Sequence, residues 1–199
     1  MADLPLVELL IDDNDNSDFE LQAIAFVDKP AIKKNFLKFS ETPVQKFAQI
    51  DKARRIVSGP ALLANTPIYR NVDGYEFNAY FSPETVYKLV QKYFRKGMNN
   101  TFNFMHSEGM ELGNVTLFES FITDAERGIK PMAGFEDAPN GSWFVSAFVE
   151  NEAAWKFIED GSVKGFSVEG MFGSAKKLTV EEKLMEDIIA ILNEHEQRS

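Results

Sequence analysis

The sequence predicts a strand-rich α+β domain, a barrel or a sandwich with two flanking helices and a helical tail. Three observations favour this class. Apolar, β-prone runs separated by turn residues recur along the chain, two segments carry the end signals of helices, and a third such segment ends the chain. At 199 residues, 44% of them hydrophobic, the chain is long enough for one full core and short for two typical domains.

Strands are predicted on both sides of one fully buried run. Residues 21–28 (LQAIAFVD) are almost continuously apolar, which is typical of a strand covered on both faces. The Asp73-Gly74 pair favours a tight hairpin between residues 67–70 and 75–81. Further β-prone runs occupy residues 7–12, 101–105, 115–123, 142–150 and 164–172.

Two helices are predicted from their start and stop signals. Ser82, followed by Pro83, caps a helix over residues 82–97, and Asn151 caps a shorter helix over residues 151–161. The first helix carries apolar residues three and four positions apart, at Val86, Leu89, Val90, Tyr93 and Phe94. We therefore expect one of its faces to pack on the core.

The C-terminal segment predicts an amphipathic helix that begins at a capping box formed by Thr179 and Glu182. This helix is either the last element of the core or an arm that binds a partner. We expect one domain over residues 1–173 and a helical tail over residues 174–199.

Composition and spacing exclude several classes of function. The formal net charge of -10 repels phosphate backbones, so we expect no binding to nucleic acid. The absence of cysteine excludes disulfides, thiol nucleophiles and cysteine-bound metals. The acidic stretch 12–18 departs from a calcium-binding EF-hand loop, and no glycine-rich phosphate loop is present. We expect neither a metal nor a cofactor.

We also expect a cytosolic protein that does not bind membranes. No apolar run approaches the roughly 18 residues that a membrane-spanning helix requires. The first residues, MADLP, lack the basic and apolar regions of a signal peptide.

Ser167 is the candidate nucleophile. It lies in GFSVEG, residues 165–170, where a glycine at each end permits close approach of another backbone or a substrate. A strand serine whose hydroxyl bonds a neighbouring carbonyl is the more ordinary interpretation. The spacing also differs from the Gly-x-Ser-x-Gly turn of α/β-hydrolases, so that class is not expected.

His106 is the candidate base, because only two histidines are present. It follows the predicted strand 101–105 at the boundary with a polar turn, where a neutral imidazole can accept the proton of a nearby hydroxyl. A histidine that is simply hydrogen-bonded at a strand end is the alternative. His195 lies at the polar end of the C-terminal helix, where we expect it to face solvent.

Glu119 and Glu169 are the candidate carboxylates. Glu119 interrupts the apolar run 115–122, and a buried carboxylate requires a partner, so it is our first choice for the third member of a serine-histidine-acid triad. An edge-strand glutamate that faces water is the alternative. Glu169 is the second choice, because it lies two residues from Ser167 and on a strand would point to the same face.

Several motifs in one order resemble a known family. The segment IYRNVDGYEFNAYFSPETVYKLVQKYFRKG is followed by FMH, then VTLFESFITD, then GSWFVSAFVENEAAWKFIEDGSVKGFSVEG. Together, over residues 65–173, they resemble the prohead proteases of tailed phages, in the branch found also in defective prophage-like elements. The upstream stretch LQAIAFVDKPAIKKNF is similar to that branch as well.

The resemblance implies a serine endopeptidase of the capsid-maturation class, distantly related to the herpesvirus assemblins, whose fold is a small β-barrel with flanking helices. Residues 1–173 would then be the protease domain. The resemblance implies that Ser167 is the nucleophile and His106 the base, acting through an acyl-enzyme. It leaves the third member open, because Ala23 stands where the family's glutamate would fall.

The implied substrates are the phage scaffold and major capsid proteins, and the chain itself, inside the immature capsid in the host cytoplasm. A homo-oligomer is compatible with this role. The rival hypothesis is a non-catalytic component of capsid assembly that has the same fold and uses the C-terminal helix as a docking arm. The presence of both Ser167 and His106 favours the enzyme.

Overall fold

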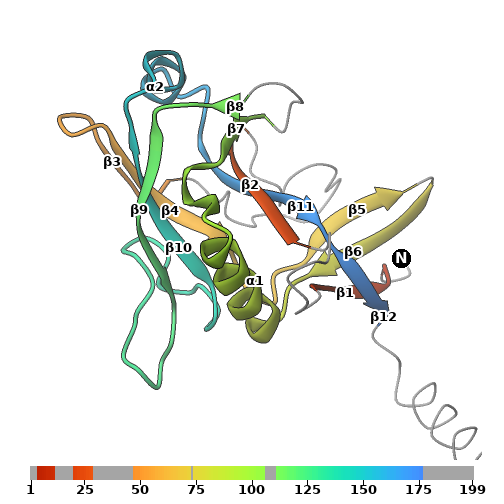
Figure 1. Ribbon diagram of the computed structural model, residues 1–199. Helices are drawn as coiled ribbons and strands as arrows, with labels where there is room; N and C mark the ends of the chain where they lie inside the picture. The colour runs from red at the N-terminus through yellow and green to blue at the C-terminus, as the bar shows by residue number, and fades with distance from the viewer. Residues whose placement is uncertain (1–3, 12–19, 29–46, 73, 106–110, 177–199) are drawn as a thin grey trace, which may run out of the picture.

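The computed structural model describes residues 4–11, 20–28, 47–72, 74–105 and 111–176 (Figure 1). The strands are β1 (Leu6–Leu10), β2 (Glu20–Val27), β3 (Gln49–Asp51), β4 (Ile56–Leu62), β5 (Ile68–Val72), β6 (Tyr75–Tyr80), β7 (Phe102–Phe104), β8 (Glu111–Leu112), β9 (Val115–Ile122), β10 (Trp143–Val149), β11 (Gly165–Met171) and β12 (Gly173–Lys176). The helices are α1 (Pro83–Arg95), the short 3-10 helix η2 (Met98–Asn100) and α2 (Glu152–Glu159). The predicted α+β class is confirmed.

Within the described residues, the strands form three sheets of four strands each. We call β12-β1-β6-β5 the hairpin sheet, β3-β4-β10-β9 the outer sheet and β11-β2-β7-β8 the Ser167 sheet. Strand pairing is antiparallel except between β1 and β6 and between β2 and β7, which pair in parallel.

The expected small β-barrel is corrected to three open sheets, because no sheet closes on itself within the described part of the chain (Figure 1). A barrel requires its first and last strands to pair. Here the chain passes at Phe172 from β11 into β12, and β12 pairs with β1 in a different sheet. As a result, the consecutive strands β11 and β12 belong to two different sheets.

The predicted buried strand is confirmed as β2, which lies between β11 and β7 in the Ser167 sheet. Its residues Ile24 and Phe26 are both 0% exposed. The predicted hairpin is also confirmed, since Val72 of β5 pairs with Tyr75 of β6 around the Asp73-Gly74 pair.

Both predicted flanking helices are confirmed together with their caps. The Ser82 hydroxyl accepts a hydrogen bond of 3.2 Å from the backbone N–H of Thr85 at the start of α1. The Asn151 side chain accepts one of 3.0 Å from the N–H of Ala154 at the start of α2. In α1 the predicted apolar face is buried apart from Phe94, which is 39% exposed. Within the described residues no helix has the length and apolarity required to cross a membrane.

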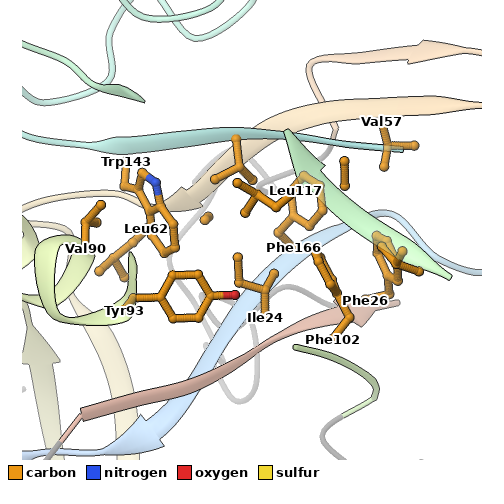
Figure 2. Packing of buried hydrophobic residues seen from close by; sticks show 14 of the residues in the cluster. Ile24, Phe26, Val57, Leu62, Val90, Tyr93, Phe102, Leu117, Trp143 and Phe166 are labelled. Carbon is orange, nitrogen blue, oxygen red and sulfur yellow. The ribbon is translucent and has the colours of Figure 1, made fainter. Parts of the chain in front are cut away.

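The core lies where α1, the outer sheet and the Ser167 sheet meet (Figure 2). The ring of Phe26 stacks on Phe102 at 5.5 Å and on Phe166 at 5.6 Å between ring centroids. Tyr93 of α1 meets Trp143 of β10 edge-on at 5.7 Å. Because Phe166 directly precedes Ser167, this aromatic packing holds the strand that carries the candidate nucleophile.

Gly141 lies where a loop passes close to the start of α1. Its φ is +86°, and a Cβ at this position would lie only 2.5 Å from the Cβ of Pro83. A left-handed backbone costs a non-glycine residue about 1–2 kcal/mol, and the collision adds to that cost. Gly161 has a similar φ of +77° but would meet nothing within 4 Å. It therefore serves as the matched control.

We expect Gly141→Ala to lower the free energy of unfolding by more than about 2 kcal/mol, and Gly161→Ala by about 1 kcal/mol. Urea denaturation of both variants measures the difference. Equal losses would show that the approach to Pro83 is not a constraint on the fold.

Tyr93 carries a buried hydroxyl that has no hydrogen-bond partner among the described residues. Burial raises the pKa of Tyr93, because the phenolate would lose its hydration. With the folded pKa above the unfolded one, this contribution to stability is complete below the unfolded pKa of about 10 and is lost as the pH rises from there toward the folded pKa.

We expect Tyr93→Phe to change the free energy of unfolding at neutral pH by less than about 1 kcal/mol, in either direction, since no hydrogen bond to a described residue is lost. Above about pH 10 the variant should lose less stability than the wild type. Urea denaturation at pH 7 and at pH 10.5 compares the two chains. Identical losses at the higher pH would contradict this explanation.

Several predictions fall outside the described residues: the acidic stretch 12–18, His106, His195 and the helix predicted within 174–199. Sheet pairing extends beyond the expected domain end at residue 173, because β12 pairs with β1 as far as Lys176. The division into a domain and a tail stays a prediction.

Candidate active site

One row of the Ser167 sheet carries the candidate nucleophile. Ser167 of β11 pairs with Ala25 of β2, which in turn pairs with Asn103 of β7. Because side chains alternate along a strand, Phe166 and Val168 face the core while Ser167 and Glu169 lie on the other face of the sheet. The sequence reasoning placed Ser167 and Glu169 on one face, and the strand geometry agrees with it.

The Ser167 side chain is buried, and its hydroxyl makes no hydrogen bond to a described residue. The residue is 3% exposed, and its Oγ has no hydrogen-bond partner among the described residues. Buried hydroxyls are nearly always hydrogen-bonded, so such an atom requires an explanation. The ordinary interpretation of a strand serine, a hydroxyl that bonds a neighbouring carbonyl, is not observed among the described residues.

Glu169 is held on the same face by Asn103. The Asn103 amide Nδ2 donates a hydrogen bond to the Glu169 carboxylate Oε2 across β2. Glu169 pairs with Ala23, and Asn103 pairs with Ala25, so only two methyl groups lie beneath this bond. The carboxylate is thus fixed on the row next to that of Ser167.

His106 lies outside the described residues, so its distance from Ser167 is not a structural observation. The residue before it, Met105, directly follows β7 and has a left-handed φ of 56°. The Met105 N–H donates a 3.0 Å hydrogen bond to the carbonyl of Phe26 in β2. The chain therefore leaves the Ser167 sheet one residue before His106. His195 also lies outside the described part of the chain.

Glu119 is exposed, and the expectation that it is buried is wrong. It lies on β9, an edge strand of the outer sheet, and pairs with Ser146 of β10. Phe118 beside it is 48% exposed, so the apolar run over β9 does not indicate burial on both faces. The alternative interpretation, an edge-strand glutamate that faces water, describes Glu119 correctly.

Asn103 is the site residue that sequence reasoning missed. It is 8% exposed and lies between Phe102 and Phe104, in a run whose apolar pattern predicts only a strand. A polar residue inside a buried strand needs a partner, which is the signal that drew attention to Glu119. The same rule applied to residues 101–105 would have found it.

No three histidine, aspartate or glutamate side chains of the described segments gather closely enough to bind a metal ion. The side chains that the structure brings together are instead a hydroxyl, a carboxylate and an amide: Ser167, Glu169 and Asn103. A hydroxyl next to a fixed carboxylate suits nucleophilic chemistry once a base removes the proton from the hydroxyl.

Fold and site together define an α+β protein with a buried hydroxyl and a held carboxylate on one sheet face. In a comparison with protein families, the family described as "Putative phage serine protease XkdF" matches residues 73–176, more than half of the chain. The chain belongs to this family. The matched segment includes α1 and both Asn103 and Ser167. No curated protein and no solved structure matches the chain.

Proposed function

We propose that this chain is a prohead maturation protease, a serine endopeptidase that cleaves phage scaffold and major capsid proteins, and its own chain. The observation that carries the proposal is the Ser167 hydroxyl, buried and without a described partner, in a segment that matches a phage serine protease family. The site of action is the immature capsid within the host cytoplasm. The net charge of -10 suits a protein that works before nucleic acid enters the capsid.

In the proposed reaction, the Ser167 Oγ bonds to the carbonyl carbon of a peptide while its proton moves to the imidazole of His106. The C–N bond then breaks, and the same proton passes to the leaving amine. Water hydrolyses the acyl-enzyme, with the imidazole again acting as base. Backbone N–H groups are the expected donors to the oxyanion.

Glu169 takes the third position in this proposal, in place of Glu119. Glu119 is exposed on the outer sheet, so it lacks the burial that would favour it for this role. Glu169 lies on the Ser167 sheet, on the same face and two residues along the same strand. A carboxylate in this position can stabilise the imidazolium that forms when His106 accepts the proton.

The proposal is tested by co-expressing the chain with the scaffold and major capsid proteins of the same phage. We expect shortened forms of both substrates, visible on a gel, and new termini that mass spectrometry locates. Intact substrates that still assemble into particles would support the rival hypothesis, a non-catalytic component of capsid assembly.

A further inference from the structure

The hydrogen bond between Asn103 and Glu169 connects two strands that are not neighbours. Asn103 lies on β7 and Glu169 on β11, with β2 between them. Neighbouring strands lie about 4.8 Å apart, so the two backbones are about 10 Å from each other. The bond is a charge-assisted one from an amide to a carboxylate, the stronger class of hydrogen bond.

The strand beneath this bond, β2, carries small side chains that leave space for the bond. Ala23 and Ala25 are the β2 residues on this face that pair with Glu169 and Asn103, and they are 7% and 0% exposed. Each carries only a methyl group, so the longer side chains of Asn103 and Glu169 can meet above them. A larger residue at either position would occupy the space that the bond crosses.

The second polar atom of Asn103 is still available. Its Oδ1 is buried and has no hydrogen-bond partner among the described residues, as is also true of the Ser167 Oγ. The amide is planar, so the bond to Glu169 fixes the orientation of Oδ1 as well. Two buried polar atoms without described partners thus lie on one row of the sheet. One is on β11 and the other on β7, the two strands that flank β2.

We propose that Asn103 is a positioning residue for the reaction at Ser167: it holds the Glu169 carboxylate on the face where the catalytic proton moves. This inference rests on the proposed protease function. Asn103 touches neither substrate nor reacting atoms in this role and acts through Glu169. Packing alone would require a side chain of this shape, whereas positioning requires the amide N–H as a donor.

The isosteric variant Asn103→Asp separates these two roles, because it keeps the shape and replaces the donor with a second carboxylate. The rate constant for labelling of Ser167 by a fluorophosphonate probe is the readout, since it requires no known substrate. We expect Asn103→Asp and Asn103→Ala to label about 10- to 100-fold more slowly than the wild type. Asn103→Gln keeps an amide donor and should label faster than either.

A double-mutant comparison tests whether Asn103 acts through Glu169. In a chain that already carries Glu169→Ala, adding Asn103→Ala should slow labelling by no more than about twofold to threefold. Asn78→Asp is the matched control, because Asn78 on β6 also has a buried Oδ1 without a described partner but belongs to the hairpin sheet. It should label at the wild-type rate. Thermal unfolding confirms that each variant is folded.

The outcomes are distinguishable. Labelling of Asn103→Asp at the wild-type rate, or multiplicative losses in the double variant, would overturn the role of Asn103 and leave the protease intact. If the wild type takes no label at Ser167, the proposed function is overturned, and the role of Asn103 with it.

Discussion

Replacing Ser167 with alanine is expected to lower the rate of peptide cleavage by roughly 10⁶-fold, the loss typical of removing the nucleophile from a serine protease. Among the described residues, the groups beside it on this sheet face, Asn103 and Glu169, are an amide and a carboxylate, and the chain has no cysteine, so neither of them replaces the hydroxyl. Co-expression of Ser167→Ala with scaffold and capsid proteins should leave both proteins uncut.

The same substitution should have little effect on stability. The Ser167 hydroxyl is buried and makes no hydrogen bond to a described residue, so its removal exposes no described partner. We expect the free energy of unfolding to change by less than about 1 kcal/mol, as measured by urea denaturation.

Ser146→Ala is the control for this result. Ser146 is 0% exposed, and its Oγ lies 2.8 Å from the Oγ of Ser58, so the variant leaves a buried hydroxyl without this partner. It should lose about 1–2 kcal/mol of stability and keep full cleavage. Cleavage that survives in Ser167→Ala would contradict the assignment of the nucleophile.

Replacing Phe26 with alanine is expected to lower the free energy of unfolding by about 3–5 kcal/mol, the largest effect on stability that we predict. Phe26 is 0% exposed and stacks on Phe102 and Phe166, which are each 1% exposed. The removed ring leaves a cavity that these two neighbours line. Because Phe166 precedes Ser167, labelling of Ser167 should also slow in the folded fraction.

Tyr75→Ala is the matched control for the loss of an aromatic ring. Tyr75 is 57% exposed on the β5–β6 hairpin, so its removal should change stability by less than about 0.5 kcal/mol. Urea denaturation of both variants gives the comparison. A loss of less than about 1 kcal/mol for Phe26→Ala would mean that the aromatic cluster does not hold the Ser167 sheet.

Short sequence patterns predicted the two helices, the hairpin and the central strand, because each of these elements depends on residues that are close together in the sequence. The capping residues Ser82 and Asn151 fix where α1 and α2 begin, and each makes the hydrogen bond that its position predicts. The Asp73-Gly74 turn pair predicted the β5–β6 hairpin for the same reason. The almost continuous apolar run 21–28 predicted a central strand, because a strand covered on both faces needs apolar residues at successive positions.

The arrangement of the strands depends on partners that are distant in the sequence, so it was not predictable in the same way. Apolar residues predominate over both β9 and β10, yet β9 lies at an edge and β10 between two strands. This difference places Glu119 in water. Asn103 and Glu169 are 66 positions apart, and their meeting follows from the pairing of β2 with both β11 and β7.

The central claim, that Ser167 is the nucleophile, is tested most directly by mapping a fluorophosphonate adduct on the wild-type protein by peptide mass spectrometry. The probe loses fluoride as the serine oxygen bonds to phosphorus, so the adduct marks the attacking atom. We predict one adduct, on Ser167. An adduct on another residue, or none under conditions that fully label a known serine protease in parallel, would contradict the claim.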